Sequence, residues 1–113
     1  MHKPNTLLGA ILLSACVFLF LCPSPIRADD SATVYHTKCA VCHAADGSGN
    51  SVMGKKLGAK DLRSDEVQKK SDAELNTAIT NGVGKTMPAY KDKLSADDIK
   101  GLVRYIRELS KKK

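Results

Sequence analysis

The stretch CAVCHAADGSG, from Cys39 to Gly49, raises the question on which the interpretation of this sequence depends. Its first five residues contain two cysteines separated by two residues, and a histidine directly follows the second cysteine. Cysteines at this spacing occur in redox-active dithiols, in zinc sites, in strained disulfides and at the covalent attachment points of haem. The rest of the chain distinguishes among these four possibilities.

Residues 1–28 have the layout of a secretory signal peptide, with a short basic start, an apolar middle and a small residue at the end. The apolar run extends from Leu7 to Cys22 and includes a glycine and a serine. It is shorter than the about 20 predominantly apolar residues that a membrane-spanning helix needs. We therefore expect cleavage after Ala28, which leaves residues 29–113 as one exported domain.

The sequence LSAC, at residues 13–16, offers a second interpretation of this leader. It resembles the lipobox at which bacterial lipoproteins are cut and acylated, and acylation of Cys16 would tether the domain to a membrane. The residues that follow, VFLFLC, are apolar, whereas lipoproteins usually carry a polar tether at this place. We favour ordinary cleavage and a location in the periplasm, with the membrane-tethered form as the alternative.

The exported domain has little apolar bulk of its own. Both phenylalanines lie in the leader, tryptophan is absent, and the remaining aromatic residues are Tyr35, Tyr90 and Tyr105. The remaining cysteines are Cys39 and Cys42. A domain of this size has a high ratio of surface to interior and usually needs a disulfide, a metal or a cofactor for stability. A large, flat, apolar cofactor would supply the missing bulk.

The charge of the chain does not indicate a nucleic-acid-binding protein. The formal net charge is +6, but the lysines are spread through the sequence and end in a terminal KKK. They are not interleaved with aromatic residues, and the arginines do not cluster. Nucleic-acid binding usually shows a concentrated basic patch and a recognisable motif. We expect no nucleic-acid partner.

The pattern of apolar residues and helix caps predicts a small all-α domain without internal repeats or strands. Ser71 and Glu74 form a capping box for a helix that ends at Asn81-Gly82. Ser95 begins the last helix, which places Ile99, Leu102, Val103 and Ile106 at helical spacing. The other expected elements are a helix over residues 31–43, a helical turn near residues 64–68, a loop with three glycines over residues 49–58, and a loop over residues 82–94.

Two of the four explanations for the cysteine pair, the redox dithiol and the zinc site, meet objections in this sequence, and so does a pair of free thiols. A thioredoxin-like dithiol needs strands that alternate with helices, and that pattern is absent. A zinc site needs four ligands, and although His36, Cys39, Cys42 and His43 are of the right types, they crowd into one short stretch. Free thiols in an oxidising compartment would tend to be oxidised. Haem attachment meets none of these objections.

Helical geometry gives the physical reason for the haem interpretation. On a helix, Cys39, Cys42 and His43 occupy positions i, i+3 and i+4, so their side chains project from one side. The two thiols can then form thioethers with the vinyl groups of haem while the imidazole reaches the iron. C-x-x-C-H is a specific signature of c-type haem attachment, and the export signal supplies the compartment. The motif occurs once, which predicts one haem.

A second axial ligand would have to come from His36, Met53 or Met87. His36 lies on the same predicted helix as His43, so it should not reach the opposite face of the ring. Met53 lies in a glycine-bearing loop, where a methionine can simply fill a gap. Pro88 biases Met87 toward an extended backbone, and a stiff extended position can hold a thioether toward iron.

The order of these features resembles that of small bacterial class I cytochromes c over residues 29–109. The resemblance covers the helix before CAVCH, the turn ADGSG, the capped middle helix, NGVGKTMPAY and the closing helix LSADDIKGLVRYIREL. It implies a small cytochrome c fold around one covalently bound haem c with its iron. It also implies thioethers at Cys39 and Cys42, with His43 as proximal and Met87 as distal ligand of the iron. Family members often carry glycine after the histidine, and we regard Ala44 as a minor departure.

The same resemblance implies crossing of the first and last helices through Tyr105 or Gly101, and the function of a soluble, monomeric electron carrier. Its partners would be membrane or periplasmic redox proteins with acidic docking surfaces, and no substrate would be turned over. Lysines in the loops expected to flank the haem would steer those partners. These are Lys55, Lys56, Lys85, Lys91 and Lys93.

Two other functions stay open at this point. A haem enzyme or a gas-sensing domain would need an exchangeable distal ligand. A lipid-anchored cytochrome subunit of a larger complex would need acylation of the leader.

Overall fold

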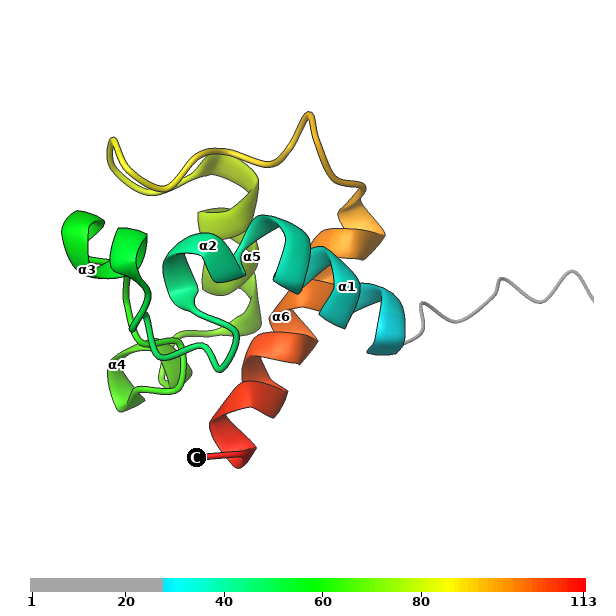
Figure 1. The fold of residues 1–113 in the computed structure, drawn as a ribbon. Coiled ribbons are helices and arrows are strands. Elements are labelled where there is room, and N and C mark those ends of the chain that lie inside the picture. Colours follow the sequence, from blue (N-terminus) through cyan, green and yellow to red (C-terminus); the bar gives the residue numbers. More distant parts are fainter. Residues whose placement is uncertain (1–27) are drawn as a thin grey trace, which may run out of the picture.

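The computed structural model describes residues 28–113, which form six helices (Figure 1). Within that range the strand-like pairing is confined to an isolated bridge between Val83 and Met87. The prediction of an all-α domain is confirmed. The helices are α1 (Ala28–Lys38), α2 (Ala40–His43), α3 (Val52–Leu57), α4 (Asp65–Gln68), α5 (Asp72–Asn81) and α6 (Ala96–Lys111).

The predicted signal peptide and the alternative tether at Cys16 lie outside the described residues, apart from Ala28. Cleavage after Ala28 therefore stays a prediction. Among residues 28–113, no helix combines the length and the apolar character that crossing a membrane requires.

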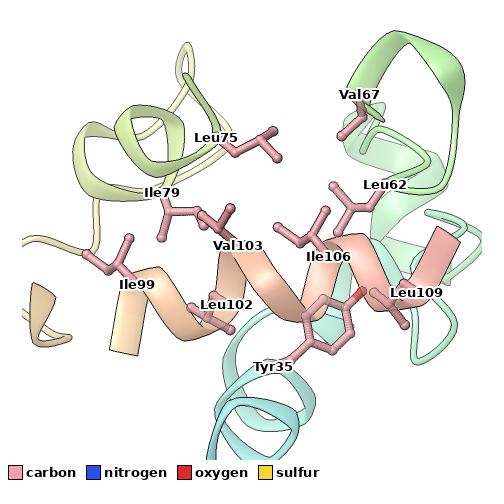
Figure 2. Close-up of a cluster of buried hydrophobic side chains, with 10 residues drawn as sticks. All are labelled: Tyr35, Leu62, Val67, Leu75, Ile79, Ile99, Leu102, Val103, Ile106 and Leu109. Atoms are coloured by element: carbon pink, nitrogen blue, oxygen red, sulfur yellow. The ribbon is translucent and has the colours of Figure 1, made fainter. Parts of the chain in front are cut away.

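Helix α6 organises the apolar core. Ser95 and Asp98 form the expected capping box, because the Ser95 hydroxyl accepts a hydrogen bond from the Asp98 N–H and the Asp98 carboxylate accepts one from the Ser95 N–H. Side chains from α1, α4, α5 and the loop before α4 then converge on the apolar face of α6 (Figure 2). The buried apolar cluster consists of Tyr35, Leu62, Val67, Leu75, Ile79, Ile99, Leu102, Val103, Ile106 and Leu109.

Helices α1 and α6 cross, as expected (Figure 1). Tyr35 of α1 is almost fully buried, and its ring centroid lies 5.0 Å from that of Tyr105 on α6. Gly101 and Leu102 are buried on α6. The two tyrosine rings therefore supply aromatic packing at a contact where the chain has no phenylalanine or tryptophan.

Helix α5 confirms the other capping-box prediction. Ser71 and Glu74 exchange the two reciprocal hydrogen bonds, and the helix ends at Asn81 before Gly82. Leu75 and Ile79 point from α5 toward α6. The chain beyond α5 is a loop, as expected.

Two boundaries predicted from the sequence are wrong. The helix expected over residues 31–43 is divided at Cys39 into α1 and α2, because the Cys42 N–H donates to the Cys39 carbonyl instead of continuing the helical ladder. The segment around Gly54, expected to be loop, contains α3. Ser51 caps this helix at its start, and Gly58 ends it with a left-handed φ of 68°.

Candidate haem-binding site

Cys39, Cys42 and His43 lie together at the junction of α1 and α2. Cys39 is the residue before α2, and its carbonyl accepts hydrogen bonds from the N–H groups of Cys42 at 3.2 Å and His43 at 2.9 Å. The Cys39 N–H donates to the carbonyl of Tyr35 at 2.8 Å, so Cys39 still belongs to the hydrogen-bonded spiral of α1. The break between the helices therefore preserves the helical spacing of the three side chains.

Both cysteines are free thiols and half-buried. Burial raises the pKa of Cys39 to about 11, while the neighbouring Lys38 lowers it and Cys42 raises it. Cys39 is consequently a neutral thiol at neutral pH in this structure. Neither cysteine is used in a disulfide, so both sulfurs are available for covalent attachment.

The ring of His43 is oriented by a backbone carbonyl. Its Nδ1 lies 3.0 Å from the carbonyl oxygen of Lys60. A carbonyl can only accept, so Nδ1 carries the proton in this contact. Nε2 is then left with a lone pair that can bind a metal, and a hydrogen bond of this kind is the usual outer partner of a metal-binding imidazole.

The backbone on both sides of His43 is also held in place. The Gly49 N–H donates to the His43 carbonyl at 2.7 Å. The hydroxyl of Tyr35 donates to the carbonyl of Ala44 at 2.8 Å. Burial raises the pKa of Tyr35 well above its ordinary value, which keeps this hydroxyl protonated as a donor.

Helix α3 is joined to α2 by Ser51 and Gly54. The Ser51 hydroxyl lies 2.8 Å from the carbonyl of Val41 and 2.9 Å from that of Cys42, and it accepts the Gly54 N–H at 2.8 Å. A side chain at Gly54 would collide with the carbonyl oxygens of Cys42 and Gly49. Sequence reasoning missed Ser51, Gly54 and Lys60, and its one available cue was a serine three residues before Gly54, the spacing of a helix N-cap.

Met87 lies in the loop after α5, which is tied to the end of that helix. The N–H groups of Tyr90 and Lys91 donate to the carbonyls of Ile79 and Thr80 at 3.0 and 3.1 Å. Met87 pairs with Val83 through two backbone hydrogen bonds of 3.0 and 3.2 Å. Its side chain is half-buried against the core cluster. This bridge is consistent with the extended backbone expected before Pro88.

Gly82 permits the close return of this loop. Its φ is 76°, and a Cβ there would lie 2.6 Å from the Met87 carbonyl oxygen and 2.9 Å from the Ala89 nitrogen. Larger residues would therefore push the segment that carries Met87 away from α5.

The elements around the cysteines expose their large apolar side chains. Val52 is 90% exposed and Val41 is 62% exposed, although each is β-branched and apolar. Helix α2 has no buried residue, and Gly54 is the buried residue of α3. A large, flat, apolar group attached here would cover this surface, so the residues present fit a haem. The exposed large apolar residues are Val41, Val52, Met53, Leu57 and Val83.

The other two candidate ligands, His36 and Met53, lie on α1 and α3. The Nε2 of His36 lies 3.3 Å from the hydroxyl of Tyr105, on the outer side of the contact between α1 and α6. Met53 is 41% exposed on α3. Among residues 28–113, no three His, Cys, Asp or Glu side chains gather in a way that could hold a metal ion, so the zinc interpretation has no support in this part of the chain.

Comparison with known proteins finds relatives among cytochromes. Residues 27–106 match the family described as cytochrome c oxidase, cbb3-type, subunit III. A solved structure, the KustC0563 c-type cytochrome, is 31% identical and superposes with a TM-score of 0.65 over 70% of this chain and 95% of its own.

Two kinds of curated proteins are similar to this chain in sequence. Cytochrome c6 of Gloeothece citriformis is 30% identical over 94% of this chain and 96% of its own length. The cbb3-type cytochrome c oxidase subunit CcoP of Azospirillum brasilense is 35% identical over 73% of this chain. The chain spans only 28% of the length of that subunit.

Ala44 has a backbone conformation that favours glycine, with φ of 65° and ψ of 161°. Alanine at this position, where family members often carry glycine, is thus more than a minor departure from the family pattern. A side chain in this region costs about 1–3 kcal/mol. We expect Ala44→Gly to raise the free energy of unfolding by about 1 kcal/mol in chemical denaturation, after allowing for the greater freedom of glycine in the unfolded chain.

Ala45→Gly is the matched control, because Ala45 is exposed and has no positive φ. It should lower the free energy of unfolding by up to about 1 kcal/mol. A destabilising Ala44→Gly would show that the conformation of Ala44 is not strained.

Proposed function

Since this chain belongs to the c-type cytochrome family, we propose that it is a one-electron carrier whose single haem is attached through Cys39 and Cys42. The predicted class I cytochrome c fold and the covalently bound haem c are confirmed by its family, its relatives and its structural neighbour. Transfer of electrons to and from redox partners follows from the same membership.

The proposed site divides its roles among four side chains. Cys39 and Cys42 would hold the haem by thioethers, His43 would bind its iron through Nε2, and Met87 would supply a second ligand. The haem would supply one-electron redox chemistry, and the methionine ligand would raise its reduction potential. The protein supplies position, exclusion of water and electrostatics.

The observation that carries this proposal is the orientation of His43. Its Nδ1 is engaged by the Lys60 carbonyl at 3.0 Å, directly after two free thiols on one helical turn. This arrangement leaves a metal-binding nitrogen beside two attachment points, and the neighbouring helix α3 exposes its apolar side chains.

We further propose a soluble, monomeric carrier in the periplasm, released after Ala28. Its partners are donor and acceptor proteins with acidic docking surfaces, because lysines flank the proposed site on α3 and on the loop of Met87. Such charges act mainly on the rate of association and lose effect as ionic strength rises. The chain itself turns over no substrate.

The similarity to CcoP favours a second candidate function, that of a subunit or tethered component of an oxidase complex. Acylation at Cys16 would provide the tether. The mass of the native N-terminal peptide separates the two candidates, because a carrier released by ordinary cleavage begins after Ala28 and a lipoprotein begins at acylated Cys16.

The optical spectrum tests the function most simply. We expect the protein produced with a haem-attachment system to give the pyridine haemochrome of a haem bound by two thioethers. The reduced protein should keep its spectrum under carbon monoxide, since Met87 occupies the second axial position. A rapid spectral change under carbon monoxide would instead identify an exchangeable distal site, as in a haem enzyme or gas sensor.

Replacement of Met87 tests the distal ligand. Met87→Ala should abolish the Fe–S charge-transfer band of the oxidised protein and lower its reduction potential, because the thioether that favours ferrous iron is lost. Covalent haem should remain. Met53→Ala is the matched control and should keep the band; the reverse result for the two variants would assign the ligand to Met53.

A further inference from the structure

Tyr90 connects the loop of Met87 to the segment that carries the cysteines. We propose that its hydroxyl is a latch that positions this loop, and thereby Met87, against the end of α1. This inference rests on the proposed role of Met87 as distal ligand. The hydroxyl donates to the carbonyl of Lys38 at 3.2 Å, and Lys38 directly precedes Cys39.

The acceptor of this hydrogen bond is created by the break between α1 and α2. In a continuous helix the Lys38 carbonyl would receive the N–H of Cys42, four residues later. Here the Cys42 N–H donates to the Cys39 carbonyl at 3.2 Å. The Lys38 carbonyl at the end of α1 is thereby released, and a carbonyl of this kind needs a partner from elsewhere. Tyr90 provides that partner from a segment far away in the sequence.

The ring of Tyr90 is itself fixed in place. The Tyr90 N–H donates to the Ile79 carbonyl at 3.0 Å, and its carbonyl accepts the N–H of Leu94 at 2.9 Å. The ring packs against the core cluster, and the ammonium of Lys93 lies 5.7 Å from the ring centroid. Burial raises the pKa of Tyr90 above its ordinary value, so the hydroxyl stays protonated near neutral pH.

The loop is consequently held on two sides. Backbone hydrogen bonds fasten it to the end of α5, and the Tyr90 hydroxyl fastens it to the end of α1. Met87 lies three residues before Tyr90. Loss of the hydroxyl removes only the hydrogen bond to the end of α1. It should therefore increase the population of a locally opened loop, in which Met87 is displaced.

The experiment compares Tyr90→Phe with wild type and with Tyr105→Phe, all as the haem-loaded protein. Both substitutions keep the aromatic ring, and the Tyr105 hydroxyl contacts His36 rather than this loop. For Tyr90→Phe we expect amide hydrogen exchange at Val83, Met87 and Lys91 to accelerate about three- to tenfold, the effect of one lost hydrogen bond. The pH midpoint at which the Fe–S charge-transfer band disappears should fall by about 0.5–1 unit for the same reason. Tyr105→Phe should leave both quantities at their wild-type values.

Unchanged loop exchange in Tyr90→Phe, or equal acceleration in Tyr105→Phe, would overturn the latch. Other results would overturn the proposed function without affecting the latch. If wild type lacks the Fe–S band, or Met87→Ala keeps it, the distal-ligand assignment fails. The difference in exchange between Tyr90→Phe and wild type still decides whether Tyr90 holds the loop, because whichever residue binds the iron does so in both proteins.

Discussion

A shortage of apolar bulk on one side of the molecule is the constraint from which the rest of the structure follows. The buried apolar side chains form one cluster around α6, to which α2 and α3 contribute none (Figure 2). Val41 of α2 and Val52 of α3 are instead exposed, as is Val83 in the loop after α5. Exposing such side chains is unfavourable unless another group covers them. In our proposal covalently bound haem is that group, so the cofactor would be part of the core as well as the redox centre.

Hydrogen bonds hold the attachment segment where apolar packing does not. Ser51 joins α3 to the Val41 and Cys42 carbonyls of α2, Lys60 orients His43, and Tyr35 fixes the peptide after His43. In the folded domain these contacts orient the thiols and the imidazole. Preorganisation of this kind is what a site needs when the cofactor supplies the chemistry and the protein supplies geometry.

Local sequence signals predicted the parts of the fold that depend on local interactions. Ser71 and Ser95 were recognisable because each capping box is complete within four residues. Helix α3 was missed because it has only six residues with Gly54 in its middle, and its packing comes from contact with α2. The contact of the Lys60 carbonyl with His43 could not be predicted, because the sequence does not show which side chain a backbone carbonyl will contact. The strain at Ala44 and the contact of Tyr90 with Lys38 likewise arise only from the tertiary path of the chain.

The most direct test of the account is the folding of the Cys39→Ala/Cys42→Ala double variant, expressed beside wild type in a host that attaches haem. The two thiols contribute little apolar area themselves, so their replacement acts chiefly through loss of the cofactor. Far-ultraviolet circular dichroism should show that the variant loses most of its helical signal, and limited proteolysis should degrade it rapidly. Native helicity and protease resistance without haem would contradict the claim that haem completes the core.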